Sequence, residues 1–392
     1  MEMKTLKCGF IGAGFAARFH YRALQHVISA KVEVVGVYSV ADDRYPFAEE
    51  RGIPVVESLE ELIDKADVLH VCTPPVTHAP LVVEILKRGK NVIVEKPFTG
   101  YFGDGSDSFN GDTFDREAGL KAALESCAQM LEAERHSAGK ILYAENWVYA
   151  PPIQKEKEII EKTRAQILWI NGEQSHSGSH SLAYGNWKLS GGGSLIGKGC
   201  HPLTAALYLK EVEGRARLGA PIRPVSVSAR THAMTRMDGF EDKGYLKTTY
   251  IDTEDFAIVH VVFEDGTVAD LIANEISLGG TNNWLRVNAN NHRTLCNMSH
   301  NDTMQTFTPD AAIYEDVYVV EKIETKAGWS EISPDEGWFL GYQHELEAFY
   351  KAVAEDGFVE SNSQLASDTI ATIYAAYLSA QRKGQEVVIT NL

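Results

Sequence analysis

Cysteine is scarce in this chain of 392 residues: there are five, widely spaced and without a Cys-x-x-Cys pair. Neither a disulfide framework nor a cysteine zinc site is expected, and a reducing compartment suits such a chain. Basic side chains are also few, because 37 Lys and Arg stand against 54 Asp and Glu and give a net charge of −17. Binding to nucleic acid or to an anionic membrane needs clustered cations. We therefore expect neither as a partner.

Long hydrophobic runs are absent too. No stretch approaches the roughly 18–20 uninterrupted apolar residues of a membrane helix. The first apolar run leads into a glycine-rich turn rather than into the cleavage site of a signal peptide, so we predict a cytoplasmic location. What is present is the composition of an ordinary globular chain, with 44% hydrophobic and 23% charged residues. At about 150 residues per domain, the length predicts two or three domains.

The first part of the chain alternates runs of β-branched residues with helix-like segments, which is the pattern of a parallel sheet with crossover helices. Strands are expected at 6–11, 32–38, 68–71, 91–94 and 141–144. Helices are expected at 15–27, 45–51, 59–65, 77–88 and 116–136. The pattern predicts an α/β domain with a doubly wound parallel sheet over residues 1–150.

A second domain is expected over residues 151–392. After a charged helix at 153–163, strands follow one another without crossover helices, and two alternating runs meet at Asp265-Gly266, a strong hairpin signal. The segment is predicted to be α+β, with an open, largely antiparallel sheet. Helical periodicity returns at 342–354 and 364–382, and these C-terminal helices are expected to pack back on the body.

A loop rich in Gly and Asp interrupts the first domain at 101–115. Loops of this length are usually functional or disordered. Two interpretations are therefore kept for this loop: a lid, and a surface insertion without a catalytic role. Calcium is disfavoured, because Ser106 stands where an EF-hand loop begins with Asp.

A glycine motif directly follows the first expected strand and opens the first expected helix. In Gly12-x-Gly14-Phe15-Ala16-Ala17, the glycines allow a tight turn and a close approach of the backbone to a pyrophosphate. The helix N-terminus adds free amides and a positive dipole, and the small Ala17 permits close packing of helix on strand. The placement favours dinucleotide binding by these residues over a plain tight turn.

The end of the second strand bears on which dinucleotide binds. The position that usually holds an acid for the ribose hydroxyls is Ser39 in this chain. Ser39 leaves room for a 2′-phosphate, but no Arg follows immediately, and Asp42 and Asp43 would repel one. NAD is therefore favoured, with NADP as the alternative.

The third expected strand is followed by Thr73-Pro74-Pro75-x-x-His78. Ligands of such sheets collect beyond the carboxyl ends of the strands, so Thr73 and Pro74 should border the cofactor. His78 either contacts cofactor or substrate, or is a histidine near the helix cap without such a role.

The next strand closes with Glu95-Lys96-Pro97. Beside a nicotinamide, Lys96 could hold a reacting hydroxyl and help to move its proton, since burial lowers the pKa of a lysine. A solvated lysine is the alternative from spacing alone.

These three motifs, at these separations, resemble the family of glucose–fructose oxidoreductase, inositol dehydrogenase and MocA (Gfo/Idh/MocA). Residues 144–151 are similar to the family's link between domains, and 191–195 to the run leading to its catalytic histidine. The resemblance spans essentially the whole chain. It implies a Rossmann domain, a C-terminal domain whose open sheet often mediates oligomerisation, and NAD(P)-linked oxidation or reduction of sugar or cyclitol hydroxyls.

The resemblance also implies roles for individual residues. Lys96 would be the lysine of the family's Glu-Lys-Pro motif, and His201 the histidine that acts as acid or base. Both would be catalytic. Glu95, Asn146 and Trp147 would lie at the cofactor, the last two near its nicotinamide.

One departure concerns His201. The family usually has Asp four residues earlier, where this chain has Gly197, so a carboxylate that would orient His201 or bind a substrate hydroxyl is missing. Either another group takes over the proton, or the substrate carries an anion that the neighbouring Lys198 meets. A solvent-facing Lys198 is the alternative.

Further substrate contacts are expected from Tyr149 and from a polar loop with His176 and His180. With Lys198 and His201, these side chains could converge on substrate hydroxyls or on a sulfonate, carboxylate or phosphate group. The histidines could also bind zinc, but without a cysteine or acid at ligand spacing we predict no metal. A loop that is merely exposed is the alternative.

The leading hypothesis is an NAD(P)-dependent oxidoreductase that transfers hydride between nicotinamide and a hydroxyl of a sugar, cyclitol or glycoside. One alternative is an NAD-dependent glycosidase, which oxidises a ring hydroxyl, eliminates the aglycone, adds water and re-reduces the ketone. The missing Asp and the added histidines suit that route. A second alternative is a non-catalytic dinucleotide-binding protein. The expected partners are a small carbohydrate, neutral or anionic, and further copies of the chain in a homo-oligomer.

Overall fold

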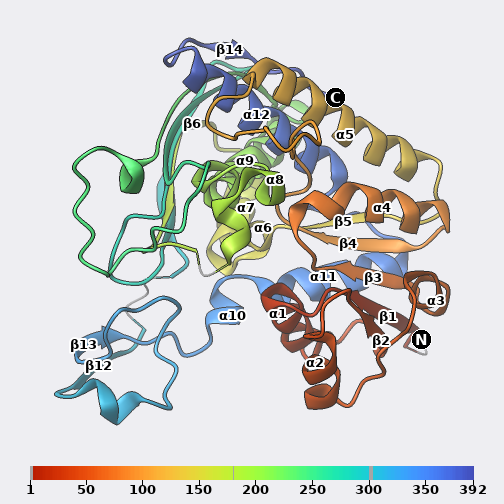
Figure 1. Ribbon diagram of the computed structural model, residues 1–392. Helices are drawn as coiled ribbons and strands as arrows, with labels where there is room; N and C mark the ends of the chain where they lie inside the picture. The colour runs from red at the N-terminus through yellow and green to blue at the C-terminus, as the bar shows by residue number, and fades with distance from the viewer. Residues whose placement is uncertain (1–2, 180, 300–302) are drawn as a thin grey trace.

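Two sheets organise the chain in the computed structural model, which describes residues 3–179, 181–299 and 303–392. Figure 1 shows the first sheet at the lower right, with helices packed around it, and the second at the upper left. Helices of the second half lie between the two sheets.

The first sheet is parallel, with the strand order β2-β1-β3-β4-β5. Every predicted strand is present, and its ends differ from the prediction by at most one residue, because apolar residues run continuously through strands that are covered on both faces. The strands are β1 (Thr5–Ile11), β2 (Lys31–Tyr38), β3 (Val68–Val71), β4 (Asn91–Glu95) and β5 (Ile141–Ala144).

Helices cover both faces of this sheet, which confirms the doubly wound α/β fold. They are α1 (Phe15–Leu24), α2 (Arg44–Arg51), α3 (Leu59–Lys65), α4 (His78–Lys87) and α5 (Arg116–Arg135). The first turn of α3 is capped by the Ser58 side chain, whereas α1 begins after Gly14 without a side-chain cap. The first amides of α1 are consequently free to bind a ligand.

The second sheet has the order β11-β10-β6-β9-β8-β7-β14. It is antiparallel except for the parallel pair β6 and β9, so the expected open, largely antiparallel sheet is confirmed. The hairpin predicted at Asp265-Gly266 joins β8 to β9. The strands are β6 (Ile167–Ser175), β7 (Pro224–His232), β8 (Phe256–Phe263), β9 (Val268–Asn274), β10 (Asn282–Ala289), β11 (Arg293–Asn297) and β14 (Val387–Val388).

The expectation that the strands of this domain follow one another without crossover helices is wrong. Helix α9 (Cys200–Leu218) lies between β6 and β7 and packs on the inner side of the sheet. Its first fifteen residues are all buried, so the segment has no polar face and its sequence shows no helical period.

The remaining helices follow β5, and α12 among them connects the two domains. Helix α12 packs against α5 of the first domain and against β7 and α9 of the second, so the C-terminal helices return to the body as predicted. These helices are α6 (Asn146–Tyr149), α7 (Pro151–Thr163), α8 (Trp187–Ser190), α10 (Glu336–Phe339), α11 (Tyr342–Glu355) and α12 (Ser363–Gln381). In the described part of the chain, no helix is both long and apolar enough to cross a membrane.

A hairpin of β12 (Gln305–Thr308) and β13 (Gly328–Glu331) projects from the body at the lower left of Figure 1. It lies apart from both main sheets.

The loop 101–115 is fastened to the second domain and does not form a free lid. The backbone N–H of Gly111 donates to the Asp252 carboxylate at 2.8 Å, and Arg236 holds Asp112 through two contacts of 2.7 Å. The Phe114 ring packs on Trp187 of α8, with ring centroids 5.0 Å apart. These contacts make the loop a fixed connection between the domains.

Candidate active site

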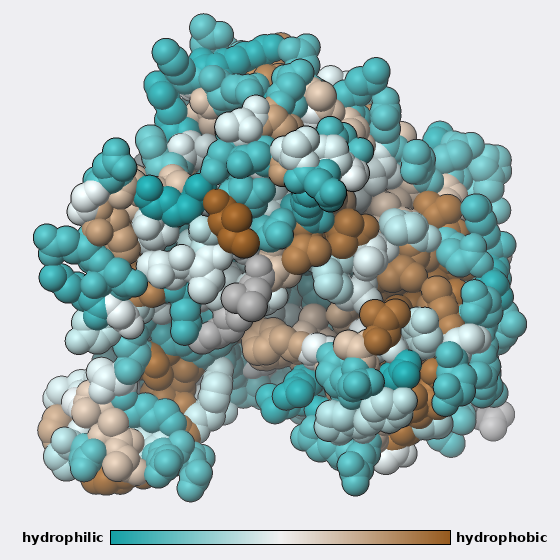
Figure 2. All heavy atoms as spheres, viewed as in Figure 1, coloured by the Kyte–Doolittle hydropathy of each residue, from teal (hydrophilic) through white to brown (hydrophobic). Residues whose placement is uncertain are grey.

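The carboxyl ends of β1, β3, β4 and β5 meet at one edge of the first sheet, where ligands of such sheets bind. Figure 2 shows the molecular surface hollowed between the two domains on the face that it presents. At the end of β1, Gly12 has φ +94°, and a Cβ there would lie 2.6 Å from the carbonyl oxygen of Cys72. A Cβ on Gly14 would meet open space.

This turn fits a dinucleotide. The bare backbone of Gly14 and the uncapped start of α1 leave amides for a pyrophosphate, and Ala17 is fully buried between helix and strand. Phe15, by contrast, is 63% exposed, and Ala16 is half-buried. The predicted cofactor-binding turn therefore has the local geometry that the glycine motif requires.

The end of β2 holds a cation that the sequence interpretation overlooked. Arg44 begins α2, and its Nη1 donates to the Ser39 carbonyl at 2.5 Å. The Ser39 hydroxyl accepts from the Ala41 N–H at 3.2 Å and donates to Asp43 at 3.3 Å. No Arg follows Ser39 immediately, as noted, but the first turn of α2 brings Arg44 back to it.

His78 joins two loops of the site. It is fully buried, with Nδ1 at 2.8 Å from the Pro97 carbonyl oxygen and Nε2 at 3.0 Å from that of Thr73. Both ring nitrogens are thus engaged with backbone carbonyls, which leaves neither for a hydrogen bond to cofactor or substrate, and contact of His78 with the cofactor stays a prediction. His78 positions the Thr73-Pro74 loop against the turn after β4.

The carboxylate of Glu95 forms a hydrogen bond with the ring of His20. Nε2 of His20 lies 3.0 Å from Oε1, and the Lys96 N–H donates to Oε2 at 3.0 Å. Burial works to raise the pKa of Glu95, but the hydrogen bond and charge of His20 outweigh it and the pKa is lowered. Glu95 thus remains a carboxylate beneath the lysine.

Lys96 points from the end of β4 toward the second domain. Its Nζ donates to the Gly197 carbonyl at 3.0 Å and lies 5.7 Å from the centre of the Tyr184 ring. Burial works to lower its pKa, yet the carboxylates of Glu95 and Glu145 raise it above the ordinary value. The expected net lowering of the Lys96 pKa is therefore not found, and the side chain remains an ammonium.

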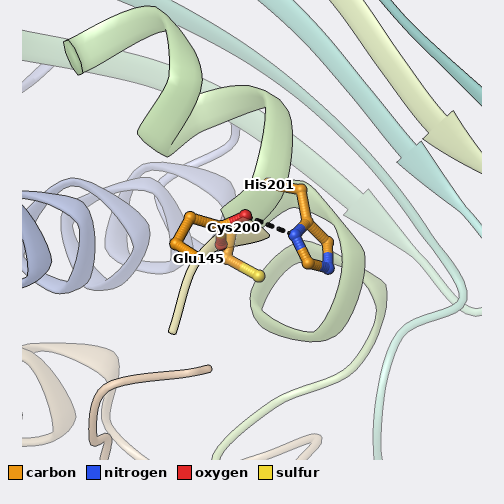
Figure 3. Close-up of side chains that lie close together, drawn as sticks. All are labelled: Glu145, Cys200 and His201. Carbon is orange, nitrogen blue, oxygen red and sulfur yellow. Dashed lines mark hydrogen bonds and ion pairs between the residues drawn. The ribbon is translucent and has the colours of Figure 1, made fainter. Parts of the chain in front are cut away.

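His201 is oriented by a carboxylate, as Figure 3 shows. Its Nδ1 donates to Oε1 of Glu145 at 2.5 Å, and the ring stacks on Trp147 with a centroid distance of 5.9 Å. The bond to Nδ1 leaves Nε2 without a proton and able to accept one. Burial is the main cause that lowers the pKa of His201, and the charge of Glu145 opposes it.

The absence of a side chain at position 197 has a steric reason. Gly197 lies in the π-helical turn Leu195–Gly199 before α9, and a Cβ there would lie 3.0 Å and 3.1 Å from two carbons of the Tyr184 ring. The aromatic ring therefore fills the space into which a side chain at 197 would extend. Glu145, from the end of β5, supplies the carboxylate instead.

Two predicted residues make contacts within the body of the protein. Asn146 is buried and donates to the Leu340 carbonyl at 2.7 Å, and its place near the nicotinamide stays a prediction. The ring of Tyr149 packs on Phe349, and its hydroxyl accepts from the Ser361 backbone N–H at 3.1 Å, which disfavours the expected substrate contact. The hydroxyl faces β5 and the chain before α12, which removes it from the site.

The polar loop after β6 contributes one described histidine. His176 is buried, and its Nε2 lies 2.8 Å from Nζ of Lys322. Lys198 is 7% exposed, so the solvent-facing alternative is wrong for it. The predicted His180 lies outside the described residues.

Glu145, Cys200 and His201 place potential ligand atoms within 4.8 Å of one another. Burial raises the pKa of the Cys200 thiol to about 12, which disfavours the thiolate that a metal would need. The hydrogen bond between Glu145 and His201 accounts for the arrangement without an ion.

Sequence reasoning missed four residues of the site: Arg44, Glu145, Tyr184 and Lys322. Glu145 stood inside the segment 144–151 and had a signal, since it directly follows a strand at the ligand edge of the sheet. Tyr184 and Lys322 come from irregular segments without a motif.

Comparison with known proteins places these features in context. The model of the Gfo/Idh/MocA family, described as an oxidoreductase family with an NAD-binding Rossmann fold, matches residues 6–108. A glucose-6-phosphate 3-dehydrogenase of Bacillus subtilis is 37% identical over 92 residues, which are 23% of this chain and 26% of that protein. The chain covers between 25% and 62% of the lengths of the curated relatives that it matches.

Solved structures match over the whole length. GenD2 from gentamicin A biosynthesis, in complex with NAD, superposes with a TM-score of 0.78 at 20% identity, covering 100% of this chain and 98% of that one. A putative myo-inositol dehydrogenase of Sinorhizobium meliloti gives a TM-score of 0.72 at 18% identity, covering 98% and 100%. At such identities these likenesses show the fold.

Proposed function

Because the chain belongs to the Gfo/Idh/MocA oxidoreductases, whose NAD-binding Rossmann fold its residues 6–108 match, we propose that it exchanges hydride between NAD and a hydroxyl of a sugar or cyclitol. The observation that carries the proposal is the Glu145–His201 pair, which lies with Lys96 beyond the strand ends that border a dinucleotide. A glucose phosphate dehydrogenase and an inositol dehydrogenase among the similar proteins support this substrate class.

Oxidation of a carbinol breaks one C–H and one O–H bond and forms a C=O bond. Bound NAD⁺ supplies the acceptor for the hydride. The chain must then remove the hydroxyl proton, and Nε2 of His201 is the group with a free lone pair for it, because Nδ1 is bonded to Glu145. As the proton arrives, the carboxylate of Glu145 stabilises the imidazolium that forms.

Lys96 has a different task. Its raised pKa keeps it protonated, so it donates hydrogen bonds and does not act as the base. One of its three N–H groups is used by the Gly197 carbonyl, which leaves two for the reacting oxygen. A fixed ammonium at that oxygen stabilises the negative charge that develops as the proton leaves.

An alternative outcome is the glycosidase route. The missing Asp and the added His176 and His180 suit that route. Both nitrogens of His176 are engaged, one by the Gly178 N–H and one by Lys322, which argues against His176 as a proton carrier; His180 lies outside the described residues. Release of an aglycone without net NADH would indicate the glycosidase, and stoichiometric NADH the dehydrogenase.

We also propose that the chain forms a homo-oligomer and is located in the cytoplasm. Ile258, Leu295 and Trp169 are partly exposed on the second sheet and fit a homo-oligomer formed through this domain, which light scattering of the purified chain tests. The five cysteines are buried and unpaired, which fits a reducing cytoplasm.

The test is a screen of sugars and cyclitols for NAD reduction, repeated with His201→Asn. We expect the variant to lose about 10²–10⁴-fold in kcat while still binding NAD. The matched control is His136→Asn, at an exposed histidine at the end of α5. Full turnover in the His201 variant would contradict the assigned role, and a panel without any NAD-linked turnover would contradict the proposed reaction.

A further inference from the structure

A buried ammonium lies next to the proposed catalytic group. Lys198 is 7% exposed, and within the described residues its Nζ makes no hydrogen bond or ion pair; its partner is the Tyr184 ring, with the centroid 5.1 Å away. Burying a charge without a polar partner is costly. Burial accordingly lowers the pKa of Lys198. Such a group calls for an anionic ligand.

A second lysine, Lys322, comes from the chain after β12 and lies near enough to Lys198 that, besides burial, the charge of Lys198 lowers its pKa. The side chain of Lys322 is 7% exposed, and its backbone has φ +61°, in the left-handed region that a lysine rarely adopts. Its Nζ lies 2.8 Å from Nε2 of His176. The backbone is thus held in an unfavourable conformation that directs this amine inward.

Hydrogen bonding fixes the protonation of this pair. Nδ1 of His176 accepts from the Gly178 N–H at 2.9 Å, so a neutral ring carries its proton on Nε2. Nε2–H then donates to Nζ of Lys322, which requires an amine with a free lone pair. Burial, together with the charge of Lys198, lowers the pKa of Lys322 to about 7. Lys322 is therefore able to remain neutral in the ligand-free chain.

The carboxylates nearby do not satisfy these lysines. Oε2 of Glu275 accepts from the Ser179 N–H at 2.6 Å and from the Tyr250 hydroxyl, and Oε1 accepts from the Ser179 hydroxyl at 3.2 Å, so both oxygens have other partners. Glu321 lies 3.8 Å from Nζ of Lys322, within ion-pair distance but beyond a hydrogen bond, and is partly exposed. Burial raises the pKa values of Tyr184 and Cys200, so neither supplies a negative charge.

The geometry points to an anion subsite formed by Lys198 and Lys322, which takes the carboxylate or phosphate group of the substrate and draws one proton from solvent onto Lys322. The inference rests on the proposed function, since it names the substrate class as a sugar or cyclitol that bears such a group. Binding breaks the His176–Lys322 hydrogen bond and forms an ammonium–oxyanion bond; one N–H bond is made, and nothing is oxidised or reduced.

The positions of Lys96 and Lys198 suit a substrate that carries both a reacting hydroxyl and an anionic group. Lys96 and Lys198 lie within 5.7 Å and 5.1 Å of the centre of the same Tyr184 ring. The hydroxyl to be oxidised would bind at Lys96 and His201, while the anionic group on the same small molecule binds at Lys198. Uptake of a proton by Lys322 gives the anion a second ammonium at the moment of binding.

The first experiment titrates inorganic phosphate into the NAD-loaded protein by calorimetry, at a pH above 7, in two buffers of different ionisation enthalpy. We expect saturable binding with uptake of nearly one proton. Lys198→Met and Lys322→Met should weaken it about tenfold or more. The control is Lys121→Met, at a lysine that is 80% exposed on α5.

The variant Lys322→Arg separates charge from folding. A guanidinium cannot be neutral, so it should bind phosphate without proton uptake. Binding that neither lysine variant weakens, or the absence of any binding, would overturn the subsite. Equal proton uptake in the wild type and in Lys322→Arg would overturn the role of Lys322.

A second experiment compares a neutral sugar, the corresponding sugar phosphate and the sugar acid as substrates. An anionic substrate should exceed the neutral one about tenfold or more in kcat/KM, and the better of the two identifies the source of the anion. Turnover of neutral sugars without charge preference contradicts the subsite alone. Phosphate binding at these lysines without turnover of any substrate contradicts the proposed function alone.

Discussion

Nδ1 of His201 donates a 2.5 Å hydrogen bond to Oε1 of Glu145, so the carboxylate that orients the histidine comes from the end of β5 and not from the turn before α9. The two residues are 56 positions apart, and Glu145 follows the last strand of the first sheet whereas His201 lies in α9, which packs on the second sheet. The acid–base pair therefore forms where elements of the two sheets meet.

Glu145→Gln tests this pair while nearly preserving volume. The amide can donate to Nδ1, which would move the proton to Nε2 and leave His201 in the wrong tautomer to accept one. We expect kcat to fall roughly 10²-fold or more, with cofactor affinity retained. Steady-state kinetics and the ¹⁵N shifts of the His201 ring measure both effects.

The control for that variant is Glu132→Gln, at a half-exposed carboxylate on α5 that contacts the exposed His136. An unaltered tautomer, or a kcat loss shared with the control, would show that Glu145 does not position His201.

The pH profile reports the state of His201. Its ordinary pKa is 6.5, and burial lowers it in this site against the raising charge of Glu145. The base form is needed for oxidation, so with a neutral sugar, whose binding draws no proton onto Lys322, kcat/KM should be level above pH 6.5 and fall on the acid side, below it. In Lys198→Met a nearby positive charge is removed, which should raise the pKa and move the acid limb to higher pH.

Kinetics over a pH series with a saturating cofactor measure this limb. A limb that stays in place in Lys198→Met, or that disappears only in His136→Asn, would rule out His201 as its source.

Arg44 is expected to govern the use of NADP. Its guanidinium lies at the Ser39 carbonyl, where a 2′-phosphate would approach the end of β2. Arg44→Ala should raise KM for NADP about tenfold and leave KM for NAD nearly unchanged, because only the phosphate needs the charge. Arg88→Ala, at a partly exposed arginine paired with Asp64 and Glu84, is the control. Equal changes for both cofactors would refute this role.

The first domain was readable from sequence because its information is local. The continuous apolar run Val68–Val71 is fully buried as β3, and Gly12 is required at its turn by a positive φ and by the approach of Cys72. Each of these properties depends on a few neighbouring residues, which a pattern can carry.

The second domain and half of the site were not readable, because their information is tertiary. Helix α9 is buried all round and has no period, and Lys322 meets His176 across 146 positions. Even Lys96, which the motif identified, has a pKa that, against burial, is raised by Glu145, a residue that follows another strand. The spacing of residues in a motif does not show which distant residues will surround a side chain, so it cannot predict whether burial or those partners determine the pKa.

The pairing of Gly197 with Tyr184 gives the last prediction. A Cβ at 197 would lie 3.0 Å from the ring, closer than nearly all such contacts, so Gly197→Asp should overpack the turn. The carbonyl of Gly197 also holds Nζ of Lys96, so displacing the turn displaces the lysine. We expect a lower Tm and a lower kcat for the single variant.

The double variant Tyr184→Ala with Gly197→Asp decides whether the clash is the cause. Removing the ring opens the space that the new carboxylate needs, so the double variant should have a higher Tm than Gly197→Asp alone, a non-additivity that only contacting residues show. Gly357→Asp, at a glycine without a positive φ whose Cβ would make only an ordinary contact of 3.6 Å, controls for the added charge. Additive losses in Tm would mean that Tyr184 does not determine which residue is tolerated at 197.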